Sequence, residues 1–256
     1  MLAVFCRFLR DNSKKICIFI YFLIKNNEIY NIMKIWTISD THRQHNFLKI
    51  PENIDVVIHA GDSTNYYNWY ENQPEFEDFL SWFSNLPIKH KVLIAGNHDA
   101  WATKKYNVDK VKELGIKYLE HEYLELQGKL LFGSPYTPNF GTWHFMKDRS
   151  KLNQYWEVLT ENIDILITHG PPKGILDLSH NMNHQLEYCG DSALFKHVLR
   201  IKPKYHIFGH IHDSEGCYNS GVLKLSSVET TFINASCVTD GKFNRGTTSN
   251  GYVFEI

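Results

Sequence analysis

The chain has 256 residues, 43% of them hydrophobic, and its formal net charge at pH 7 is −1. This length and apolar content are enough to bury one large core. The near-neutral charge argues against a long basic surface and so excludes extended nucleic-acid contacts. The five cysteines are scattered and contain no C-x-x-C pair. That pattern argues against a disulfide framework or a zinc ribbon and predicts a reducing, cytoplasmic location.

Residues 1–32 carry a short apolar stretch, ICIFIYFLI at 16–24, which is flanked by lysines. A membrane-spanning helix needs about 20 apolar residues, and no small-residue cleavage site follows this stretch. We therefore expect an N-terminal extension ahead of a single domain at 33–256. The alternatives are an apolar anchor that associates with a membrane through residues 16–24, a cleaved signal, and a non-native start of the chain.

From Met33 onward the sequence alternates between strand and helix patterns. Short β-rich apolar runs predict strands at 33–38, 54–59, 91–95, 129–133, 164–168 and 205–208. Apolar residues at helical spacing predict helices at 74–84, 103–114, 148–160 and 191–201. This alternation predicts a largely parallel sheet with helices on its faces, and Asp191 is the expected N-cap of the last helix. Residues 221–256 contain only strand and turn patterns, which predicts a second, more antiparallel sheet that closes a layered sandwich.

Polar clusters follow five of the predicted strands at their carboxyl ends, where ligands collect in sheets of this kind. Each cluster alone is weak evidence, because a lone histidine or aspartate is more often an ordinary surface or core residue. Together the clusters supply oxygen and imidazole donors from these side chains: Asp40, His42, Asp62, Asn97, His169, His210 and His212. Such donors without a thiolate suit Mn, Fe, Zn or similar ions.

Two divalent ions would give this set of ligands a net positive charge, because Asp40 and Asp62 are its only carboxylates. Asp62 can bridge the two ions through its two oxygens. We expect Mn, with Fe, Zn or Mg as alternatives. A small phosphorylated substrate would be attracted to such a site, and the extra charge of its transition state would be stabilised there.

The motifs DTH, GD, GNHD, THG and GHIH, in this order, resemble the signature of calcineurin-like metallophosphoesterases. The longer segments HAGDST, IAGNHD, FGSPYTPNFGTWHF, DILITHGPPKGILD, PKYHIFGHIH and TTFINAS are similar to the subfamily of metallophosphoesterase-domain-containing proteins. The resemblance covers nearly everything from Met33 to the C-terminus. It implies an α/β fold, a four-layer α-β-β-α sandwich in which two mixed sheets are flanked by helices.

The resemblance also implies a role for each candidate residue. It divides the metal ligands into three for one ion (Asp40, His42 and His212), three for the other (Asn97, His169 and His210) and one bridge (Asp62). His98 matches the histidine that stands near the leaving group, where an imidazolium can protonate the departing oxygen. Arg43 could bind a substrate phosphate, or be an ordinary exposed arginine. Asp99 could orient the His98 ring, or be a surface carboxylate.

Two further groups surround the predicted site. His59 is expected to be a buried histidine that supports the ligands without binding an ion. Aromatic residues follow the bridging aspartate or lie in the loop 133–143: Tyr66, Tyr67, Trp69, Tyr70, Tyr136 and Trp143. They could stack on a nucleobase, but packing under a long loop is the more frequent use of such residues.

The function predicted from these observations is hydrolysis of a small phosphodiester, such as a cyclic or nucleotide substrate, by a hydroxide that bridges two metal ions. A protein phosphatase of the same superfamily would carry GD-x-x-D-R-G after the bridging aspartate, whereas this chain has GDSTNYY. The neutral charge also disfavours a nuclease. The alternatives are a scaffold with this fold and a nucleotide-binding protein that turns its ligand over poorly.

Overall fold

The computed structural model describes residues 32–181, 183–239 and 246–256. Residues Met33–Ile256 form one compact unit. The predictions for the apolar stretch at 16–24 and for the start of the chain concern residues outside the described ranges and stay predictions. Within the described ranges, no helix is long and apolar enough to cross a membrane.

The first large sheet has the strand order β15-β1-β2-β3-β4. Its strands are β1 (Lys34–Ile38), β2 (Val56–His59), β3 (His90–Leu93), β4 (Lys117–Tyr118) and β15 (Tyr252–Glu255). Strands β1 to β4 run parallel, and β15 pairs antiparallel with β1. Two helices cover this sheet. Helix α2 (Trp69–Ser84) lies in the connection after β2, and α3 (Lys105–Glu113) lies in the connection after β3, where it follows the short 3-10 helix η3 (Ala100–Thr103).

The second large sheet has the order β13-β14-β12-β9-β6-β5. Its strands are β5 (Glu122–Leu126), β6 (Lys129–Ser134), β9 (Ile165–Thr168), β12 (Tyr205–Phe208), β13 (Gly221–Lys224) and β14 (Thr231–Asn234). The four central strands are parallel and both edge strands are antiparallel. Helices α4 (Leu152–Trp156) and α5 (Ser192–Ile201) cover its outer face. As expected, Asp191 caps α5, since its side chain accepts from Ala193 N–H at 2.8 Å.

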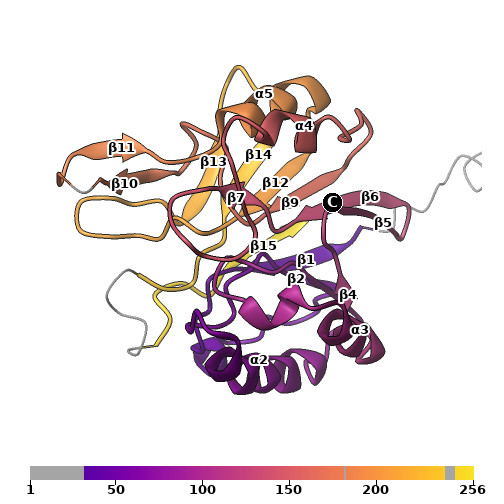
Figure 1. Cartoon of the computed structure of the whole chain (residues 1–256). Helices are drawn as coiled ribbons and strands as arrows, with labels where there is room; N and C mark the ends of the chain where they lie inside the picture. Colours follow the sequence, from indigo (N-terminus) through magenta and orange to yellow (C-terminus); the bar gives the residue numbers. More distant parts are fainter. Residues whose placement is uncertain (1–31, 182, 240–245) are drawn as a thin grey trace, which may run out of the picture. The chain divides into compact units, whose positions relative to one another are not determined.

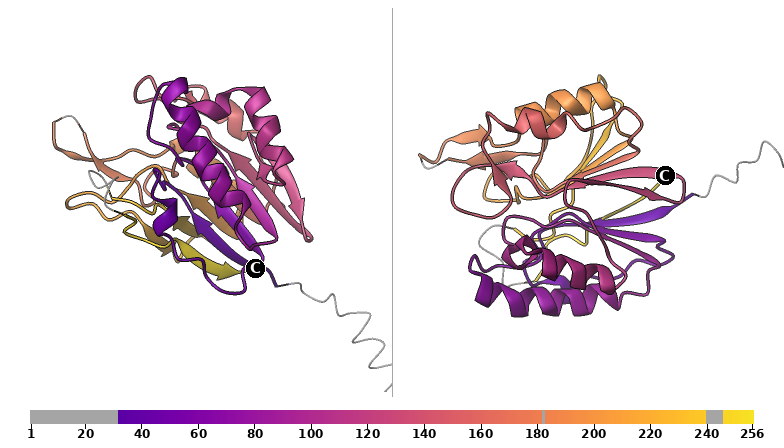
Figure 2. Two further views of the ribbon diagram at one scale, coloured as in Figure 1. Left: turned by 90° about the horizontal axis from the view of Figure 1, so that it is seen from below. Right: turned by 45° about the vertical axis from the view of Figure 1, so that its right-hand side comes forward.

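Four layers result, with helices outside and the two sheets face to face (Figure 1 and the right view of Figure 2). Three clusters of buried side chains fill the spaces between adjacent layers. On β2, Val56 and Ile58 face the other sheet while Val57 packs against the helices with Phe79 of α2. Because both faces of the central strands are buried, these strands read as continuous apolar runs. The predicted four-layer sandwich is confirmed.

The predicted assignment of strands to sheets was wrong. The alternating strands do not form a single sheet, because β1, β2 and β3 belong to the first sheet and β6, β9 and β12 to the second. The C-terminal strands do not form a sheet of their own either, since β13 and β14 join the second sheet and β15 joins the first. The alternation of strand and helix is a local pattern and is the same in both sheets, so it carries no information on which strands pair.

Two helix boundaries also differ from the prediction. Helix α2 begins at Trp69, before Pro74, because Asn68 provides its N-cap by accepting from Glu71 N–H at 3.0 Å. Helix α4 spans only Leu152–Trp156. Smaller elements complete the fold: η2 (His45–Phe47), the pair β7 (Thr137–Pro138) and β8 (Met146–Lys147), and the pair β10 (Leu178–His180) and β11 (Leu186–Tyr188).

Candidate metal centre

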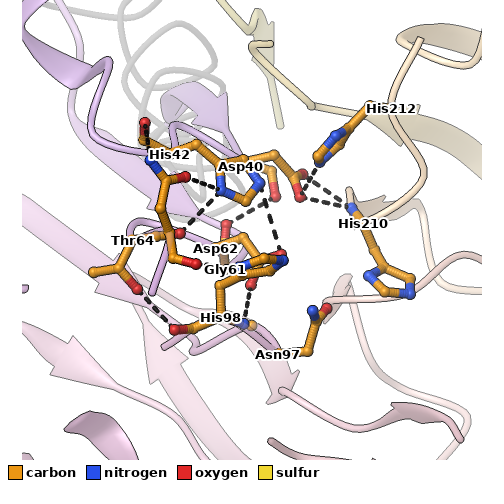
Figure 3. A network of polar contacts seen from close by, with 12 residues as sticks. Asp40, His42, Gly61, Asp62, Thr64, Asn97, His98, His210 and His212 are labelled. Carbon is orange, nitrogen blue, oxygen red and sulfur yellow. Dashed lines mark hydrogen bonds and ion pairs between the residues drawn. The ribbon is translucent and has the colours of Figure 1, made fainter. Parts of the chain in front are cut away.

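The predicted ligands gather where the parallel strands of both sheets end. Asp40, Asp62 and Asn97 follow β1, β2 and β3 of the first sheet, whereas His169 and His210 follow β9 and β12 of the second. The two sheets face each other with these carboxyl ends at a common edge, so side chains far apart in sequence meet there (Figure 3).

The first group contains Asp40, His42 and His212, whose candidate ligand atoms all lie within 4.8 Å of one another. His212 Nε2 lies 2.9 Å from Asp40 Oδ1. All three side chains are buried, and Figure 3 shows them pointing toward one another. Together they offer one carboxylate and two imidazoles to a single ion.

The second group contains Asp62, His169 and His210, whose candidate ligand atoms also lie within 4.8 Å of one another. His169 Nε2 lies 3.2 Å from Asp62 Oδ2 and 3.0 Å from Asn97 Oδ1. The structure therefore brings Asn97 to this group, as predicted.

Asp62 connects the two groups. Its carboxylate belongs to the group with His169 and to a further set with His42 and His98, again within 4.8 Å. Asp62 Oδ2 lies 3.9 Å from His42 Nε2 and 3.2 Å from His169 Nε2. Asp62 therefore lies between the candidate ligand atoms of the two groups. The roles of these residues as ligands stay predictions.

The histidine tautomers fit metal coordination. His42 Nδ1 lies 2.9 Å from the carbonyl of Thr64, and His169 Nδ1 lies 2.9 Å from the carbonyl of Ala60. A carbonyl only accepts, so each Nδ1 carries a proton and donates it. The Nε2 atoms, which face the carboxylates, are then the ring atoms that could bind a cation, as in many metal sites where the other ring nitrogen donates to a carbonyl.

The electrostatics of the centre also favour cations. Asp40 and Asp62 are both buried, and two buried carboxylates are costly unless positive charge accompanies them. Burial alone would lower the pKa of His169, but the adjacent Asp62 carboxylate raises that pKa to about 9. Burial lowers the pKa of His42 to about 4. In the ion-free chain, protonated His169 thus compensates part of the negative charge that cations would otherwise neutralise.

Glycines let the backbone approach the ligands closely. A Cβ at Gly61 would lie 2.5 Å from His169 Nδ1, and one at Gly96 or Gly209 would collide with the carboxylate of Asp62 or Asp40 respectively. The ligands themselves also hold unusual backbone conformations. Asp40, His42, Asp62 and His210 have φ values of 50°, 41°, 56° and 69°. Such left-handed geometry costs free energy in residues with a side chain, and it concentrates at functional sites.

Asp99 has neither of its two predicted roles. Its side chain is fully buried and accepts backbone N–H groups from Gly96 at 2.8 Å, Asp62 at 2.9 Å and Ser63 at 3.0 Å. Thr64 donates to it as well, through its hydroxyl at 2.9 Å. Asp99 therefore ties the loop of Asp62 to the loop of Asn97. A carboxylate accepts many donors at once, which explains a role that the motif alone does not reveal.

His59 is buried beside the ligands, as expected. Gly61 N–H donates to its Nδ1 at 3.2 Å, so the proton is on Nε2, which donates to Thr41 Oγ1 at 3.0 Å. Burial lowers the pKa of His59 to about 3 and keeps it neutral. His59 thereby connects the segments that carry Asp40 and Asp62 without facing the ion positions.

His98 and Arg43 border the centre. His98 N–H donates to Asp62 Oδ1 at 2.7 Å, and its Nδ1 donates to the carbonyl of Asn65 at 2.8 Å. Its Nε2 is then the ring atom available to a substrate. Arg43 is 48% exposed but its Nε pairs with Glu75 of α2 at 3.1 Å, a partner that its sequence position did not suggest. Their roles toward substrate stay predictions.

Aromatic side chains form the rim of the centre. The rings of Trp143 and His98 have centroids 4.1 Å apart, and those of Phe140 and His210 are 5.2 Å apart. Tyr67 contacts Trp143 edge to face and stacks on His144. For the aromatic residues after Asp62 the favoured prediction of core packing was wrong, since Tyr66, Tyr67, Trp69 and Tyr70 are 45%, 46%, 37% and 81% exposed. Tyr136 packs elsewhere, against His121 and Tyr155.

Several residues that support the candidate ligands were not predicted from the sequence. The side-chain oxygen of Asn65 accepts a hydrogen bond from His42 Nδ1 at 2.9 Å. The backbone carbonyl of Asn65 accepts one from the His98 ring. Ser236 contacts Asp40. Asn65 lies in the GDSTNYY segment and Ser236 in TTFINAS, so the motifs contained them. Their residue types alone gave no signal, because asparagine and serine are common in loops.

The fold and this arrangement agree with comparisons to known proteins. The family model of the calcineurin-like phosphoesterases matches residues 33–214, and the chain belongs to that family. Metallophosphoesterase domain-containing protein 1 of Homo sapiens is 31% identical over 227 residues, which cover 79% of this chain and 65% of that protein. UPF0046 protein K07C11.7 of Caenorhabditis elegans is 34% identical over 218 residues, 80% of this chain and 69% of that protein.

These matches confirm the predicted resemblance, although this chain spans less than two thirds of the human relative. Among solved structures, TT1561 of Thermus thermophilus superimposes with a TM-score of 0.54 at 12% identity, over 80% of this chain and 89% of that one. This similarity shows the shared fold. The chain is therefore a phosphoesterase-family protein with a candidate metal-binding site.

Proposed function

We propose that this protein hydrolyses a small phosphodiester at a site for two divalent cations. The observation that carries the proposal is the position of Asp62. Its carboxylate lies within 4.8 Å of candidate ligand atoms of His42 and His98 on one side, and within 4.8 Å of those of His169 and His210 on the other. A carboxylate placed in this way can hold two ions close together. Paired ions, when bound, supply a nucleophile derived from water and positive charge for the phosphoryl oxygens.

The protein's own groups perform the remaining tasks. The buried candidate ligands would hold the cations, and burial would strengthen the attraction of those cations for an anionic substrate. His98 holds its Nδ1 proton on the Asn65 carbonyl, so its Nε2 can carry a second proton and donate it to a departing oxygen. Such general-acid assistance typically contributes a factor of about 10² to 10⁴ in rate.

The rim supports a substrate with an aromatic group, as in a nucleotide. Trp143 lies beside His98 and Phe140 lies beside His210. Phe140 is 56% exposed, so its ring is open to contact. Exposed rings beside a phosphate-binding site can stack on a base, and such stacking is worth about 1–3 kcal/mol per base. A nucleotide diester is thus the substrate class that we favour.

The test compares hydrolysis of bis(p-nitrophenyl) phosphate and p-nitrophenyl phosphate by metal-free protein, with and without added Mn²⁺. We expect Mn²⁺-dependent cleavage with preference for the diester. Asp62→Ala and the isosteric Asp62→Asn should abolish it. Asp109→Asn, which removes an exposed carboxylate on α3, is the matched control and should leave the rate unchanged.

Each alternative has its own result. Preference for the monoester would contradict the phosphodiesterase assignment while retaining the metal-dependent chemistry. Binding of Mn²⁺ without cleavage of either ester would favour a scaffold or a nucleotide-binding protein. Absence of Mn²⁺ binding in the unsubstituted chain would contradict the two-cation site itself.

A further inference from the structure

The segment after β14 meets the segment after β1 at the junction of the two large sheets. Ser39 and Ser236 form an isolated parallel bridge. In it Ser39 N–H donates to the carbonyl of Ala235 at 2.9 Å, and Cys237 N–H donates to the carbonyl of Ser39 at 2.9 Å. The TTFINAS motif therefore ends directly beside Asp40.

The hydroxyl of Ser236 contacts the Asp40 carboxylate. Ser236 Oγ donates to Asp40 Oδ2 at 2.8 Å, and both residues have no exposed surface. The other groups on this carboxylate are His210 N–H, 3.0 and 2.9 Å from its two oxygens, and His212 Nε2, 2.9 Å from Oδ1. His210 N–H thus contacts both oxygens, whereas the Ser236 hydroxyl contacts Oδ2 and His212 contacts Oδ1.

Asn234 places Ser236 and the histidine-bearing turn together. Its Oδ1 accepts from Ser236 N–H at 3.1 Å, and its Nδ2 donates to the carbonyl of Ile211 at 3.0 Å. Ile211 lies between His210 and His212. Asn234 is fully buried, so this amide links the backbone of Ser236 to the backbone between two predicted ligands.

We propose that Ser236 is a positioning residue for the cation held at Asp40, and that its hydroxyl fixes the rotation of the Asp40 carboxylate. This inference rests on the proposed function, because it takes Asp40, His42 and His212 as ligands of one ion. Groups that orient a ligand typically change metal affinity by a factor of about 10 to 100 when they are removed. Loss of the hydroxyl should weaken the ion at Asp40 and leave the ion at Asn97 and His169 nearly unchanged.

The experiment is a calorimetric titration of the metal-free chain with Mn²⁺ alone. Ser236→Ala should weaken one of the two binding steps about 10- to 100-fold, and Ser236→Thr, which keeps a hydroxyl, should restore it. The matched control is Ser220→Ala. The Ser220 hydroxyl also makes a 2.8 Å hydrogen bond to this segment, but to the carbonyl of Ser236, so both binding steps should stay within about threefold.

A second variant, Ser236→Cys, tests the same proposal if Ser236→Ala does not fold. Ser236→Cys is close in volume but a weak donor, and it should weaken the same binding step. Two unchanged Mn²⁺ affinities in a folded Ser236→Ala or Ser236→Cys protein would overturn the positioning role. Equal weakening of both steps by Ser220→Ala would overturn it too, because it would indicate a general effect of the segment. Absence of Mn²⁺ binding in the unsubstituted chain would instead refute the proposed function.

Discussion

The carboxylate of Asp99 accepts the backbone N–H of Asp62 at 2.9 Å and that of Gly96 at 2.8 Å. One buried side chain thereby fixes the loop that carries the central carboxylate of the metal centre to the loop that carries Asn97. Burial raises the pKa of Asp99 to about 6 despite these hydrogen bonds. The geometry of the centre depends on this residue even though it faces no ion position.

Asp99→Asn tests that dependence. The amide nitrogen of the asparagine cannot accept hydrogen bonds from the backbone N–H groups that now donate to the carboxylate. Some of these buried N–H groups would therefore lose their partner. We expect the free energy of unfolding to fall by about 1–3 kcal/mol, measured by urea denaturation of the ion-free protein. Asp109→Asn on the exposed face of α3 should change it by less than about 0.5 kcal/mol. Equal values for the two variants would contradict the role of Asp99.

Gly96→Ala tests the close approach of backbone and ligand. The added methyl group would collide with the Asp62 carboxylate, so Asp62 or the loop must move. We expect Mn²⁺ affinity to fall by at least about tenfold, in the range seen when groups that orient ligands are lost. Gly221→Ala, whose methyl group would meet nothing within 4 Å, is the control and should bind Mn²⁺ like the unsubstituted chain.

Cation removal should lower stability, because Asp40 and Asp62 are buried close together. At a free Mn²⁺ concentration about 100 times the dissociation constant, one bound ion adds about 2.7 kcal/mol to the free energy of unfolding. We expect chelation to reverse this increase in a thermal melt. The increase should be smaller in Asp62→Asn. An unfolding temperature that Mn²⁺ leaves unchanged would argue against a site in the folded chain.

His98→Asn tests proton donation to the leaving group. The asparagine amide can replace the bond of Nδ1 to the Asn65 carbonyl but has no group at the position of Nε2. We expect kcat to fall about 10²- to 10⁴-fold for a diester with an alkyl leaving group. With p-nitrophenolate, which departs without protonation, the loss should be much smaller. Equal losses for both leaving groups would exclude general-acid catalysis by His98.

The lowered pKa of His206 should make the free energy of unfolding depend on pH. This residue is buried on β12, its Nε2 lies 2.9 Å from Thr168 Oγ1, and burial lowers its pKa from 6.5 to about 3. The folded state therefore excludes a proton that the unfolded chain binds below about pH 6.5. Stability is lost as the pH falls from about 6.5 toward 3, and between pH 7 and 5 the loss is about 2 kcal/mol.

The control for this effect is His206→Gln, which keeps a donor for Thr168 but does not titrate. Urea denaturation at pH 7 and pH 5 measures the free energy of unfolding of both proteins. Between these pH values it should fall by about 2 kcal/mol more in the unsubstituted chain than in His206→Gln. His59 and the other buried histidines titrate in both proteins, so their contributions cancel in the difference. Identical pH dependence in the two proteins would show that the pKa of His206 is the same in the folded and unfolded states, and would contradict this prediction.

Local patterns in the sequence indicated an α/β fold and the donor types of the candidate site. Apolar runs that end in Asp40, Asp62, Asn97 and His169 are local patterns, and strand ends of this kind lie at one edge of a sheet. Donor types are likewise read directly from the residues. The four-layer sandwich and the grouping of the ligands were implied by the resemblance to calcineurin-like phosphoesterases, because local patterns do not show which strands pair or which side chains meet.

The pairing of the strands and the contacts that hold the candidate ligands could not be predicted from the sequence. The division of the strands between two sheets, the ion pair of Arg43 with Glu75, the burial of Asp99 and the contact of Ser236 with Asp40 all join residues distant in sequence. Serine, arginine and aspartate have many possible hydrogen-bond partners. Their partners follow from the packing of the whole chain, because burial selects the donors and acceptors that must satisfy one another.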